Sequence, residues 1–433
     1  MEEERCPDGA TFCTHAWRFI QMTAKHSSVL VVGGGMSGIT AAVEAAELGR
    51  EVYLVERAPS LGGRVSAMKS YFPKLCPPAC GLEINYQRIR KNPRIQVFTS
   101  TRVTAISGEP GDLQVELVSE PSYVKESCTD PITPFQQLPA ELSDDFNYGL
   151  SKKRPAGLVH PHAFPSRPVV DPRALEDEKL RSLLQGVEQV DLEQQPQKFT
   201  LQVGAVVWAT GWVPYDASRI DYLGYSEFAD VVSNVEFERL AAPDGPTGGK
   251  LLRPSDGKEC RRVAFIQCAG SRDVNHLPYC SAVCCLASLK QATYVREAYS
   301  DSQVWIFYID IRANKYEAFY QHLQEDANIH FVKGKVGLVE GTSDGSLHLL
   351  AENIAAGGIE SVDVDLVVLA TGMVPSTRLE PVPCQQVQTD EYGFVVSDPA
   401  ATGIVATGCA KRPADVATCV QDATAAALLA TLR

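Results

Sequence analysis

The strongest constraint on the fold is a glycine-rich turn between a short apolar strand and an alanine-rich helix. The strand VLVV is followed by GGGMSG, by TAAVEAAELG with helical spacing, and by a second strand, EVYLVE. Gly33, Gly35 and Gly38 satisfy G-x-G-x-x-G, which permits a tight turn, close helix packing and close approach of a pyrophosphate to backbone N–H groups. Glu56 ends the second strand, where a carboxylate can accept hydrogen bonds from both ribose hydroxyls. We predict dinucleotide binding, because a turn that serves only helix packing leaves Glu56 unexplained.

The residues after Glu56 favour FAD over NAD. The chain continues as ERAPSLGGR, and a paired glycine with an arginine soon after the ribose acid resembles the same region of flavoproteins. Further on, RIQVFTSTRVTAISG predicts a strand pair in which the backbone of Val103 would meet the adenine. The candidate cofactor residues of this region are Arg57, Gly62, Gly63, Arg64 and Val103.

Two later strands end in the same motif. VGAVVWATGWVP and VDLVVLATGMVP both reach A-T-G and continue with an apolar residue, Val and Pro. Such repeated strand ends mark crossings between a flavin domain and an inserted domain. Gly211, in the first of them, is a further cofactor candidate.

The C-terminal segment predicts a strand, a turn at Gly408 and a helix from about Asp415. Many flavoproteins with two dinucleotide-binding domains carry an aspartate after this glycine, bonded to the ribityl chain. Cys409 stands there in this sequence, so that contact must come from the backbone or from elsewhere. We expect the helix to point its positive N-terminal end toward the isoalloxazine, where it would stabilise reduced anionic flavin.

A second βαβ pattern lies between the two A-T-G strands. It consists of RRVAFIQ as strand, SAVCCLASLKQATYVREA as helix and SQVWIFYIDI as strand. The loop after its first strand is CAGSRDVNHLPYC, which lacks the glycine fingerprint of a pyrophosphate cradle. We therefore expect no NAD(P)H at this domain.

Four cysteines occupy that loop and the expected start of the helix: Cys268, Cys280, Cys284 and Cys285. They supply four thiolates, the number that a cubane iron–sulfur cluster needs. We expect Cys280 and Cys284 to share one helix face, and the helix start to lower the thiol pKa values. A structural zinc site, an adventitious disulfide and buried thiols are the alternatives, although zinc prefers C-x-x-C knuckles, which this loop lacks.

Composition narrows the function class. The chain has 433 residues, enough for two or three domains, and 45% hydrophobic with 21% charged residues is ordinary for a globular protein. A net charge of -13 without clustered Lys and Arg argues against nucleic acid as a partner. No stretch approaches the ~20 apolar residues of a spanning helix, and the acidic N-terminus lacks the features of a secretory signal. We expect a cytoplasmic protein whose 13 cysteines are metal ligands, redox groups or buried thiols.

Several specific motifs resemble the A subunit of heterodisulfide reductase, and more closely its relative, the A subunit of the quinone-interacting membrane-bound oxidoreductase. They are GGGMSG to ERAPSLGGR, FPKLCPPACGLEINYQRIRKNPRIQVFTS, CAGSRD with YCSAVCC, FYIDIRANKYEAFYQHL and GCAKRPADVATCVQDA. The likeness covers nearly all of residues 27–433. It implies a thioredoxin-reductase-like α/β flavoprotein with two Rossmann-like domains and an irregular insert. It also implies FAD, and a [4Fe-4S] cluster on Cys268, Cys280, Cys284 and Cys285.

The resemblance implies six segments. They are an N-terminal extension (1–26), a first FAD-binding segment (27–118), a degenerate ferredoxin-like insert (119–195), an FAD-binding continuation and crossover (196–257), a second Rossmann-like domain with the cysteine motif (258–375) and a C-terminal FAD-binding segment (376–433). The insert keeps only Cys128, so it cannot hold a ferredoxin cluster. Its sparse periodicity predicts extended surface packing, as either a docking surface or a tolerated loop.

The lost ferredoxin cysteines favour the quinone-linked relative. The implied function is electron transfer between the quinone pool and adenylylsulfate reductase, in dissimilatory sulfur metabolism. The implied partners are a second flavin and iron–sulfur subunit, together with a haem-bearing, quinone-reactive membrane subunit, which would hold the chain at the cytoplasmic membrane face. The alternatives are a soluble heterodisulfide-reductase-like subunit in bifurcation or sulfur oxidation, and a non-catalytic flavin or metal redox sensor. An NAD(P)H-dependent disulfide reductase is disfavoured because its glycine loop and C-x-x-C are missing at the expected place.

Three minor features stay open. Cys76 and Cys80 in CPPAC could face the flavin or bind metal with outside cysteines, although two prolines favour a fixed turn over a helix. His160 and His162 are expected to be exposed loop residues. Asp310 and Arg312 are expected to form an ion pair at a strand end. The remaining cysteines, Cys6, Cys13, Cys260, Cys384 and Cys419, have no predicted role beyond packing.

Overall fold

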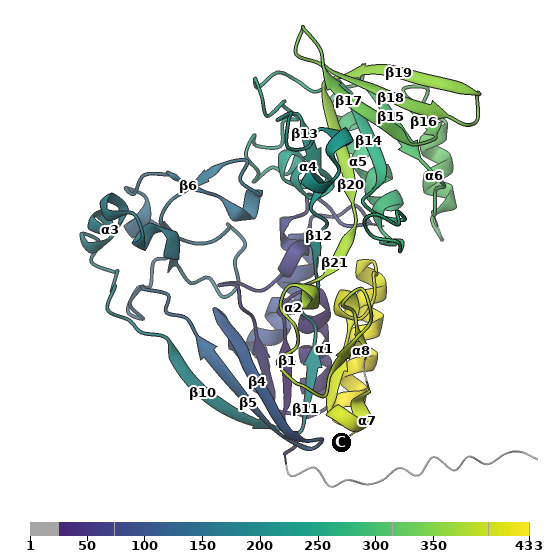
Figure 1. The fold of residues 1–433 in the computed structure, drawn as a ribbon. Coiled ribbons are helices and arrows are strands. Elements are labelled where there is room, and N and C mark those ends of the chain that lie inside the picture. Colours follow the sequence, from purple (N-terminus) through teal and green to yellow (C-terminus); the bar gives the residue numbers. More distant parts are fainter. Residues whose placement is uncertain (1–25, 73, 314, 397, 433) are drawn as a thin grey trace, which may run out of the picture.

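Two five-stranded parallel sheets organise the molecule (Figure 1). A computed structural model describes residues 26–72, 74–313, 315–396 and 398–432; the predicted N-terminal extension, apart from His26, lies outside them. The first sheet has the order β24-β11-β1-β2-β3. Its strands are β1 (Val29–Val32), β2 (Val52–Val55), β3 (Ile95–Phe98), β11 (Ala205–Trp208) and β24 (Ile404–Ala406).

Helices α1 (Met36–Glu47), α2 (Pro78–Lys91) and α8 (Val416–Thr431) accompany the first sheet. In Figure 1 the yellow α8 lies beside the purple α1. The two helices approach closely because both bury alanines, namely Ala41, Ala42, Ala45 and Ala46 in α1 and Ala423, Ala426, Ala427 and Ala430 in α8. The C-terminal segment thereby completes the domain that the N-terminal glycine turn begins.

The second parallel sheet has the order β13-β20-β14-β15-β16. Its strands are β13 (Val231–Ser233), β14 (Arg262–Ala269), β15 (Gln303–Tyr308), β16 (Ile329–Lys333) and β20 (Leu366–Thr371). The helices of this domain are α4 (Asn234–Ala241), α5 (Cys284–Ala298) and α6 (Glu317–Gln324). The predicted fold class, an α/β protein with two Rossmann-like domains, is confirmed.

Each parallel sheet is accompanied by an antiparallel three-stranded sheet. The first contains β4 (Thr101–Glu109), β5 (Asp112–Ser119) and β10 (Gln197–Val203), and the second contains β17 (Val336–Gly341), β18 (Leu347–Asn353) and β19 (Gly358–Val364). Strand β5 buries alternate residues, Leu113, Val115 and Leu117, because one face of the sheet packs on the core and the other faces water.

The two A-T-G motifs lead into a two-stranded ribbon between the domains. After the first motif comes β12 (Trp212–Pro214), and after the second comes β21 (Met373–Pro375). The strands pair antiparallel, with Val213 opposite Val374. The chain thus crosses between the domains at these repeated strand ends, while the segment boundaries given above stay predictions.

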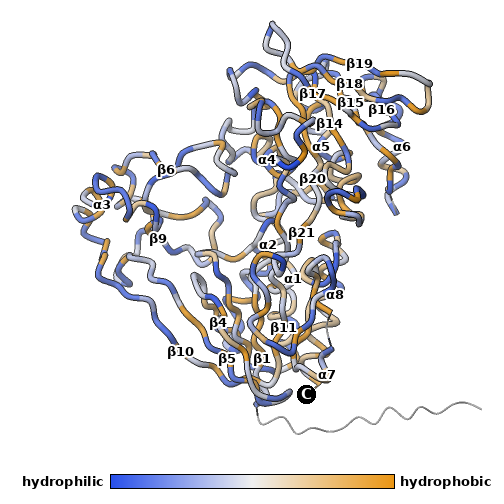
Figure 2. Tube along the Cα trace, viewed as in Figure 1, coloured by the Kyte–Doolittle hydropathy of each residue, from blue (hydrophilic) through white to orange (hydrophobic). Residues whose placement is uncertain are grey.

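The region between β5 and β10 is packed rather than extended, so the prediction of extended surface packing was wrong. It forms α3 (Glu178–Gln185) and four short strands, β6 (Leu142–Ser143), β7 (Lys152–Lys153), β8 (Ala156–Gly157) and β9 (Val169–Val170). Phe135, Leu180 and Leu184 lie in its own hydrophobic cluster. Figure 2 shows hydrophilic and hydrophobic residues alternating around α3. Short elements and single turns hide this pattern from a periodicity search.

Arg239 of α4 ties this insert to both domains. Its side chain is completely buried, and its guanidinium lies 4.4 Å from the ring centre of Phe146. It donates to Asn147 Oδ1 at 2.7 Å and to the carbonyl of Ala67 at 3.3 Å, and it pairs with Asp244 at 3.1 Å. The insert is therefore held against the rest of the molecule by a paired, buried charge.

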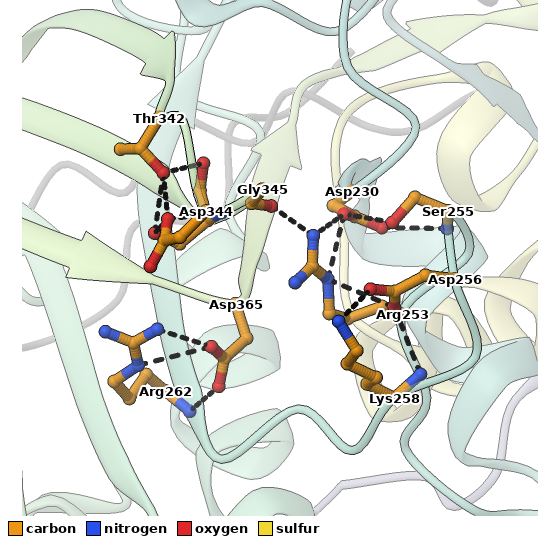
Figure 3. A network of polar contacts seen from close by, with 11 residues as sticks. Asp230, Arg253, Ser255, Asp256, Lys258, Arg262, Thr342, Asp344, Gly345 and Asp365 are labelled. Atoms are coloured by element: carbon orange, nitrogen blue, oxygen red, sulfur yellow. Dashed lines mark hydrogen bonds and ion pairs between the residues drawn. The ribbon is translucent and has the colours of Figure 1, made fainter.

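A second buried ion pair, between Asp230 and Arg253, lies in the second domain (Figure 3). Asp230 Oδ2 accepts hydrogen bonds from Arg253 Nε at 3.0 Å and Nη2 at 2.8 Å. Ser255 donates to the same carboxylate through its backbone N–H and its hydroxyl, and Arg253 also donates to the carbonyl of Gly345. The network joins the start of β13, the loop before β14 and the turn between β17 and β18.

The shorter elements are β22 (Gln388–Thr389), β23 (Val395–Val396) and α7 (Pro399–Thr402). Among the described residues, no helix has both the length and the apolar character needed to cross a membrane.

Candidate flavin site and cysteine loop

A cavity of about 530 Å³ runs between the two domains. Its walls come from the glycine turn after β1, the end of β2, the first A-T-G motif, the start of α8, the insert and helices α4 and α5. Predicted cofactor residues that line it are Gly33, Gly35, Glu56, Arg57, Gly63, Arg64, Gly211 and Cys409. Gly38, Gly62, Val103 and Gly408 are not among its lining residues.

The glycine turn leaves no room for side chains at two positions. Gly33 has φ +106°, and a Cβ there would lie 2.4 Å from the carbonyl oxygen of Ala209. A Cβ on Gly38 would lie 1.7 Å from the carbonyl oxygen of Gly33. Gly38 therefore acts away from the cavity, by letting α1 approach the turn, while Gly33 keeps the turn close to the first A-T-G motif.

Glu56 closes the turn from the end of β2. Its carboxylate accepts hydrogen bonds from the N–H of Gly34 at 2.5 Å and of Ala58 at 2.7 Å. Desolvation raises the pKa of Glu56, although these two hydrogen bonds act against the rise. Glu56 thus lies at the cavity wall beside the glycine turn, and its role in binding a ribose stays a prediction.

The paired glycines and Arg64 shape the next part of the wall. Gly62 has φ +112°, and a Cβ there would lie 2.6 Å from the Tyr86 hydroxyl. Arg64 Nε donates to the carbonyl of Trp212 at 2.6 Å, and its Nη1 donates to the Tyr148 hydroxyl at 3.1 Å. Arg64 therefore links the first domain, the crossover ribbon and the insert around the cavity.

The turn at Gly408 is held by a residue that the sequence analysis did not identify. Asp422 of α8 accepts hydrogen bonds from the N–H of Gly408 and the Thr407 hydroxyl, both at 2.9 Å, and from Lys411 at 3.0 Å. Residues Asp415, Val416 and Ala417 at the start of α8 line the cavity, as expected for the helix that was predicted to face the flavin. Asp422 thereby fixes the turn that carries Cys409.

The Asp422→Asn variant is expected to lose about 1–2 kcal/mol of unfolding free energy at pH 7, because it loses a charged acceptor. Desolvation acts to raise the pKa of Asp422, but hydrogen bonds from Gly408, Lys411 and Thr407 bring it below its usual value. The stabilisation is therefore complete above about pH 4 and is lost as pH falls through the lowered pKa. Urea unfolding at several pH values checks this; a wild-type advantage that grows on acidification would contradict it.

The cavity fits a flavin dinucleotide in three respects. Gly33 and Gly35 form its floor at a helix start, where backbone N–H groups can receive a pyrophosphate. Glu56 and the start of α8 both line the cavity. Thr210 Oγ1, in the first A-T-G motif, is buried and has no hydrogen-bond partner among the described residues, although Thr210 lines the cavity. An unpaired buried hydroxyl at a cavity wall indicates a polar ligand.

A buried polar group in the second domain also reaches the cavity, and the sequence analysis missed it. Lys290 of α5 is 4% exposed and pairs with Glu238 of α4 at 2.8 Å. Gln291 donates to the same carboxylate, to Glu238 Oε1 at 2.7 Å. Lys290, Glu238, Gln291 and Asn234 all line the cavity. Their one sequence signal is a Lys-Gln pair inside an otherwise apolar stretch of α5.

The four cysteines of the motif lie together at the end of β14 and the start of α5. Helix α5 begins at Cys284, so Cys280 lies in the preceding loop, and the expected shared helix face was wrong. Cys284 Sγ faces the carbonyl of Thr371 at 3.8 Å, and Cys285 Sγ faces the carbonyl of Asp310 at 3.7 Å. Three non-glycine residues of this region have left-handed backbone: Cys268 (φ 58°), Arg272 (φ 56°) and Ala282 (φ 64°). Such conformations cost energy and concentrate at functional loops.

Burial dominates the protonation of these thiols. Desolvation raises the pKa of Cys268 to about 11, and it also raises the pKa values of Cys284 and Cys285. The expected lowering by the helix start was therefore wrong, because removal from water outweighs the helix dipole here. Negative charge on the other cysteines of the set adds to each rise, whereas Arg272 opposes it at Cys268. The thiols are thus close enough to influence one another.

The type of donor atom favours a metal cluster, but the arrangement of these donors in the described residues does not form a metal site. Four free thiols, on the end of β14, the following loop and the start of α5, match the chemistry of a cubane cluster. Within the described ranges, however, no group of three or more His, Cys, Asp or Glu side chains is arranged to hold a metal ion. The cluster therefore stays a prediction, and it requires the loop of residues 270–283 to rearrange around it.

The structure contradicts two of the minor predictions and agrees with two others. Cys80 lies inside α2, so the CPPAC motif starts a helix at Pro78, contrary to the predicted fixed turn. His160 is buried, faces the Ser60 hydroxyl at 3.0 Å and stacks on Phe146, so its predicted exposure was wrong. His162 is exposed. Arg312 lies 3.6 Å from Asp310, which confirms that ion pair, although Arg272 contacts the same carboxylate more closely.

Sequence and structure comparisons agree on the class of protein. The family described as FAD dependent oxidoreductase matches residues 28–95. The iron-sulfur A subunit 2 of CoB–CoM heterodisulfide reductase from Methanopyrus kandleri is 34% identical over 412 residues, which cover 92% of this chain and 63% of the relative. The A subunit of ferredoxin:CoB–CoM heterodisulfide reductase from Methanosarcina mazei is 34% identical over 431 residues, with 95% and 54% covered. The chain thus spans less than two thirds of the length of these relatives.

Solved structures show the same fold at low identity. Thioredoxin reductase of T. acidophilum superposes with a TM-score of 0.51 at 15% identity, covering 93% of this chain and 97% of that enzyme. Thioredoxin reductase of Lactococcus lactis gives a TM-score of 0.50 at 14% identity, with 94% and 98% covered. The chain is therefore similar to the A subunit of heterodisulfide reductase over more than nine tenths of its length, its first segment matches the FAD dependent oxidoreductase family, and its fold is that of thioredoxin reductases.

Proposed function

We propose that the chain is an electron-transfer subunit that carries FAD in the cavity and a [4Fe-4S] cluster on Cys268, Cys280, Cys284 and Cys285. One observation carries the proposal: the helix that bears the vicinal cysteines begins at the cavity wall. Val283, Leu286 and Ala287 line the cavity, and they flank Cys284 and Cys285 directly. Two of the residues that would hold the cluster are therefore adjacent in the chain to residues that would contact the flavin.

The two groups would supply complementary chemistry, because flavin exchanges one or two electrons and an iron–sulfur cluster exchanges them singly. The chain's own residues would position and insulate them. The start of α8 presents partial positive charge to the cavity, and the Lys290–Glu238 pair holds a fixed charge at its wall. Buried residues around Cys284 would keep water from the path between the two groups.

The second domain supports electron transfer over hydride entry. In the first domain the turn between β1 and α1 consists of residues 33–35, whereas in the second domain residues 270–283 separate β14 from α5. Cys280 lies in that long loop, and Cys268, Cys284 and Cys285 lie on the elements at its two ends, where a dinucleotide-binding turn would have its glycine fingerprint. The Methanopyrus kandleri relative is named as an iron-sulfur protein, which agrees with this choice.

The Cys284→Ser variant tests the cluster. We expect the wild-type chain, purified without oxygen, to contain about four iron atoms and one FAD, and to give a cluster EPR signal on reduction. The variant is expected to lose most of the iron and the signal while keeping its flavin, because a serine replaces one ligand beside the cavity. Cys128→Ser, in the insert, is the matched control and should keep both. Zinc, or no metal, in the wild-type chain would overturn the cluster.

For the physiological role we propose the quinone-linked complex. The insert keeps a single cysteine, Cys128, so its composition favours a chain without ferredoxin clusters. The proposed partners are adenylylsulfate reductase, a haem-bearing membrane subunit that reacts with quinone, and a second flavin and iron–sulfur subunit, with attachment at the cytoplasmic membrane face. Purification of the chain with its native complex tests this. Haem and quinol-dependent flavin reduction support it, whereas a haem-free complex would favour the soluble heterodisulfide-reductase-like alternative.

A further inference from the structure

Two cysteine side chains on the cavity wall form a pair that the proposed cluster does not use. Cys409 lies in the turn after β24, and Cys419 lies in the first turn of α8. Their sulfur atoms are 3.7 Å apart. Both side chains are buried, at 6% and 7% exposure, and both residues line the cavity. The sequence analysis gave Cys419 no role, because nothing in the sequence shows that the turn and the helix bring these sulfurs together.

The surroundings of the pair are apolar on one side and polar on the other. Met373 and Ala414 pack against the two cysteines, and Trp212 and Val283 complete this small cluster. Ser37, at the start of α1, hydrogen-bonds to Cys419. Both sulfurs also face the carbonyl oxygen of Ala414, at 3.4 Å from Cys409 and 3.9 Å from Cys419. The open direction for the pair is therefore the cavity.

The two thiols are not equivalent. Hydrogen bonding from Cys409, with help from Ser37, lowers the pKa of Cys419, although desolvation opposes this. The hydrogen bond to Cys419 and desolvation both raise the pKa of Cys409. The start of α8 adds partial positive charge near Cys419. An unequal pair of this kind, in which one thiol loses its proton more readily than the other, is typical of dithiols that form and break a disulfide.

We propose that Cys409 and Cys419 are a redox-active dithiol that exchanges an electron pair with the bound flavin. On oxidation, two S–H bonds break and one S–S bond forms between the residues, with the loss of two electrons and two protons. The oxidised flavin accepts the electrons, and it takes up the protons together with solvent in the cavity. The reverse reaction reduces the disulfide with reduced flavin.

The sulfur atoms of Cys409 and Cys419 must move closer together before a disulfide bond can form. A disulfide has its sulfurs at about 2.05 Å, so the pair must close from its observed contact distance. Gly408, with φ +61°, lets the turn carry Cys409 toward α8, and Asp422 holds that turn from the helix. The pair thus stores two electrons beside a cofactor that can also pass them singly, which deepens the proposed electron-transfer function and rests on FAD in the cavity.

A reductive titration of the FAD-loaded, full-length chain tests the proposal. Starting from the fully oxidised state without oxygen, the wild type is expected to take up about two more electrons per chain than Cys419→Ser, because a disulfide is a two-electron couple. Cys409→Ala should behave like Cys419→Ser. Cys384→Ser, a cysteine that does not line the cavity, should behave like the wild type.

Peptide mapping gives a readout that does not depend on activity. Samples are quenched with acid, alkylated and digested with trypsin without reductant. Cleavage after Lys411 separates Cys409 from Cys419, so a disulfide between them appears as two linked peptides. The linked species should be present in the oxidised wild type and disappear during the titration.

Equal electron uptake by wild type and Cys419→Ser, or no linked peptide in the oxidised wild type, would overturn the dithiol. If both cysteine variants fail to bind FAD, the peptide map of the wild-type chain still shows whether Cys409 and Cys419 form a disulfide. Failure of the proposed electron-transfer function gives results that differ from failure of the dithiol. A chain without FAD has no flavin absorbance, and a chain without a cluster contains no iron.

Discussion

Replacing Gly33 by alanine is expected to abolish FAD binding. The residue has φ +106°, which L-residues rarely adopt, and the new Cβ would lie 2.4 Å from the backbone oxygen of Ala209. Because that neighbour is backbone in the first A-T-G motif, it cannot move aside as a flexible side chain could. Backbone strain and overlap together cost about 2–5 kcal/mol, so FAD affinity should fall by a factor of about 30 to several thousand.

Flavin absorbance of the purified Gly33→Ala chain, followed by titration with added FAD, measures this loss. Gly337→Ala is the matched control, because a Cβ added at Gly337 would meet no atom within 4 Å and the residue lies on β17, away from the cavity. The control should bind FAD like the wild type. Retention of full flavin by Gly33→Ala would show that the glycine turn does not form the cofactor site.

The Asp230→Ala variant is expected to destabilise the second domain by about 3–5 kcal/mol, because the buried Arg253 guanidinium loses its closest carboxylate and keeps only Asp256, at 3.6 Å, as an acidic partner. Asp230 and Arg253 side chains are only 5% and 8% exposed, so water cannot replace the lost carboxylate. The variant also removes the acceptor of both Ser255 hydrogen bonds (Figure 3). Denaturant unfolding followed by circular dichroism measures the change.

Glu141→Ala supplies the comparison for an exposed ion pair. Glu141 and Lys179 lie 2.8 Å apart, but their side chains are 43% and 67% exposed. Such pairs contribute about 0–1 kcal/mol, so this variant should unfold nearly like the wild type. Similar losses in Asp230→Ala and Glu141→Ala would contradict the assignment of Asp230 and Arg253 as a structural pair.

The first βαβ unit could be predicted because its constraints are local. Gly38 is required by a contact within the turn and its helix, and the strand, helix and second strand follow one another directly. The contact that requires Gly33 is with distant Ala209, but Gly33 could still be found because it belongs to the local glycine fingerprint. Glu56 could be found for the same reason, since the end of β2 lies beside the turn. The paired A-T-G motifs likewise indicated the two crossings, because each strand end leads straight into the ribbon.

Other features depend on contacts between distant segments. Asp422 acts on a turn 14 residues earlier, and Lys290 meets Glu238 from another helix. His160 becomes buried only because Ser60 and Phe146 enclose it. The start of α5 was misplaced for a local reason, since Ala282 adopts left-handed backbone and interrupts a sequence with good helical composition. Apart from the Lys-Gln pair in α5, such features leave no signal in spacing or composition.

The central claim is that the cavity and the cysteine loop form one electron path, and photoreduction of the flavin in the anaerobic full-length chain tests it most directly. Flavin absorbance and the EPR spectrum of samples frozen at successive times are measured together. The account predicts that a reduced-cluster signal of about one electron per chain appears as the flavin loses electrons, at matching rates. A flavin that is fully reduced and reoxidised while no iron–sulfur signal appears would contradict it.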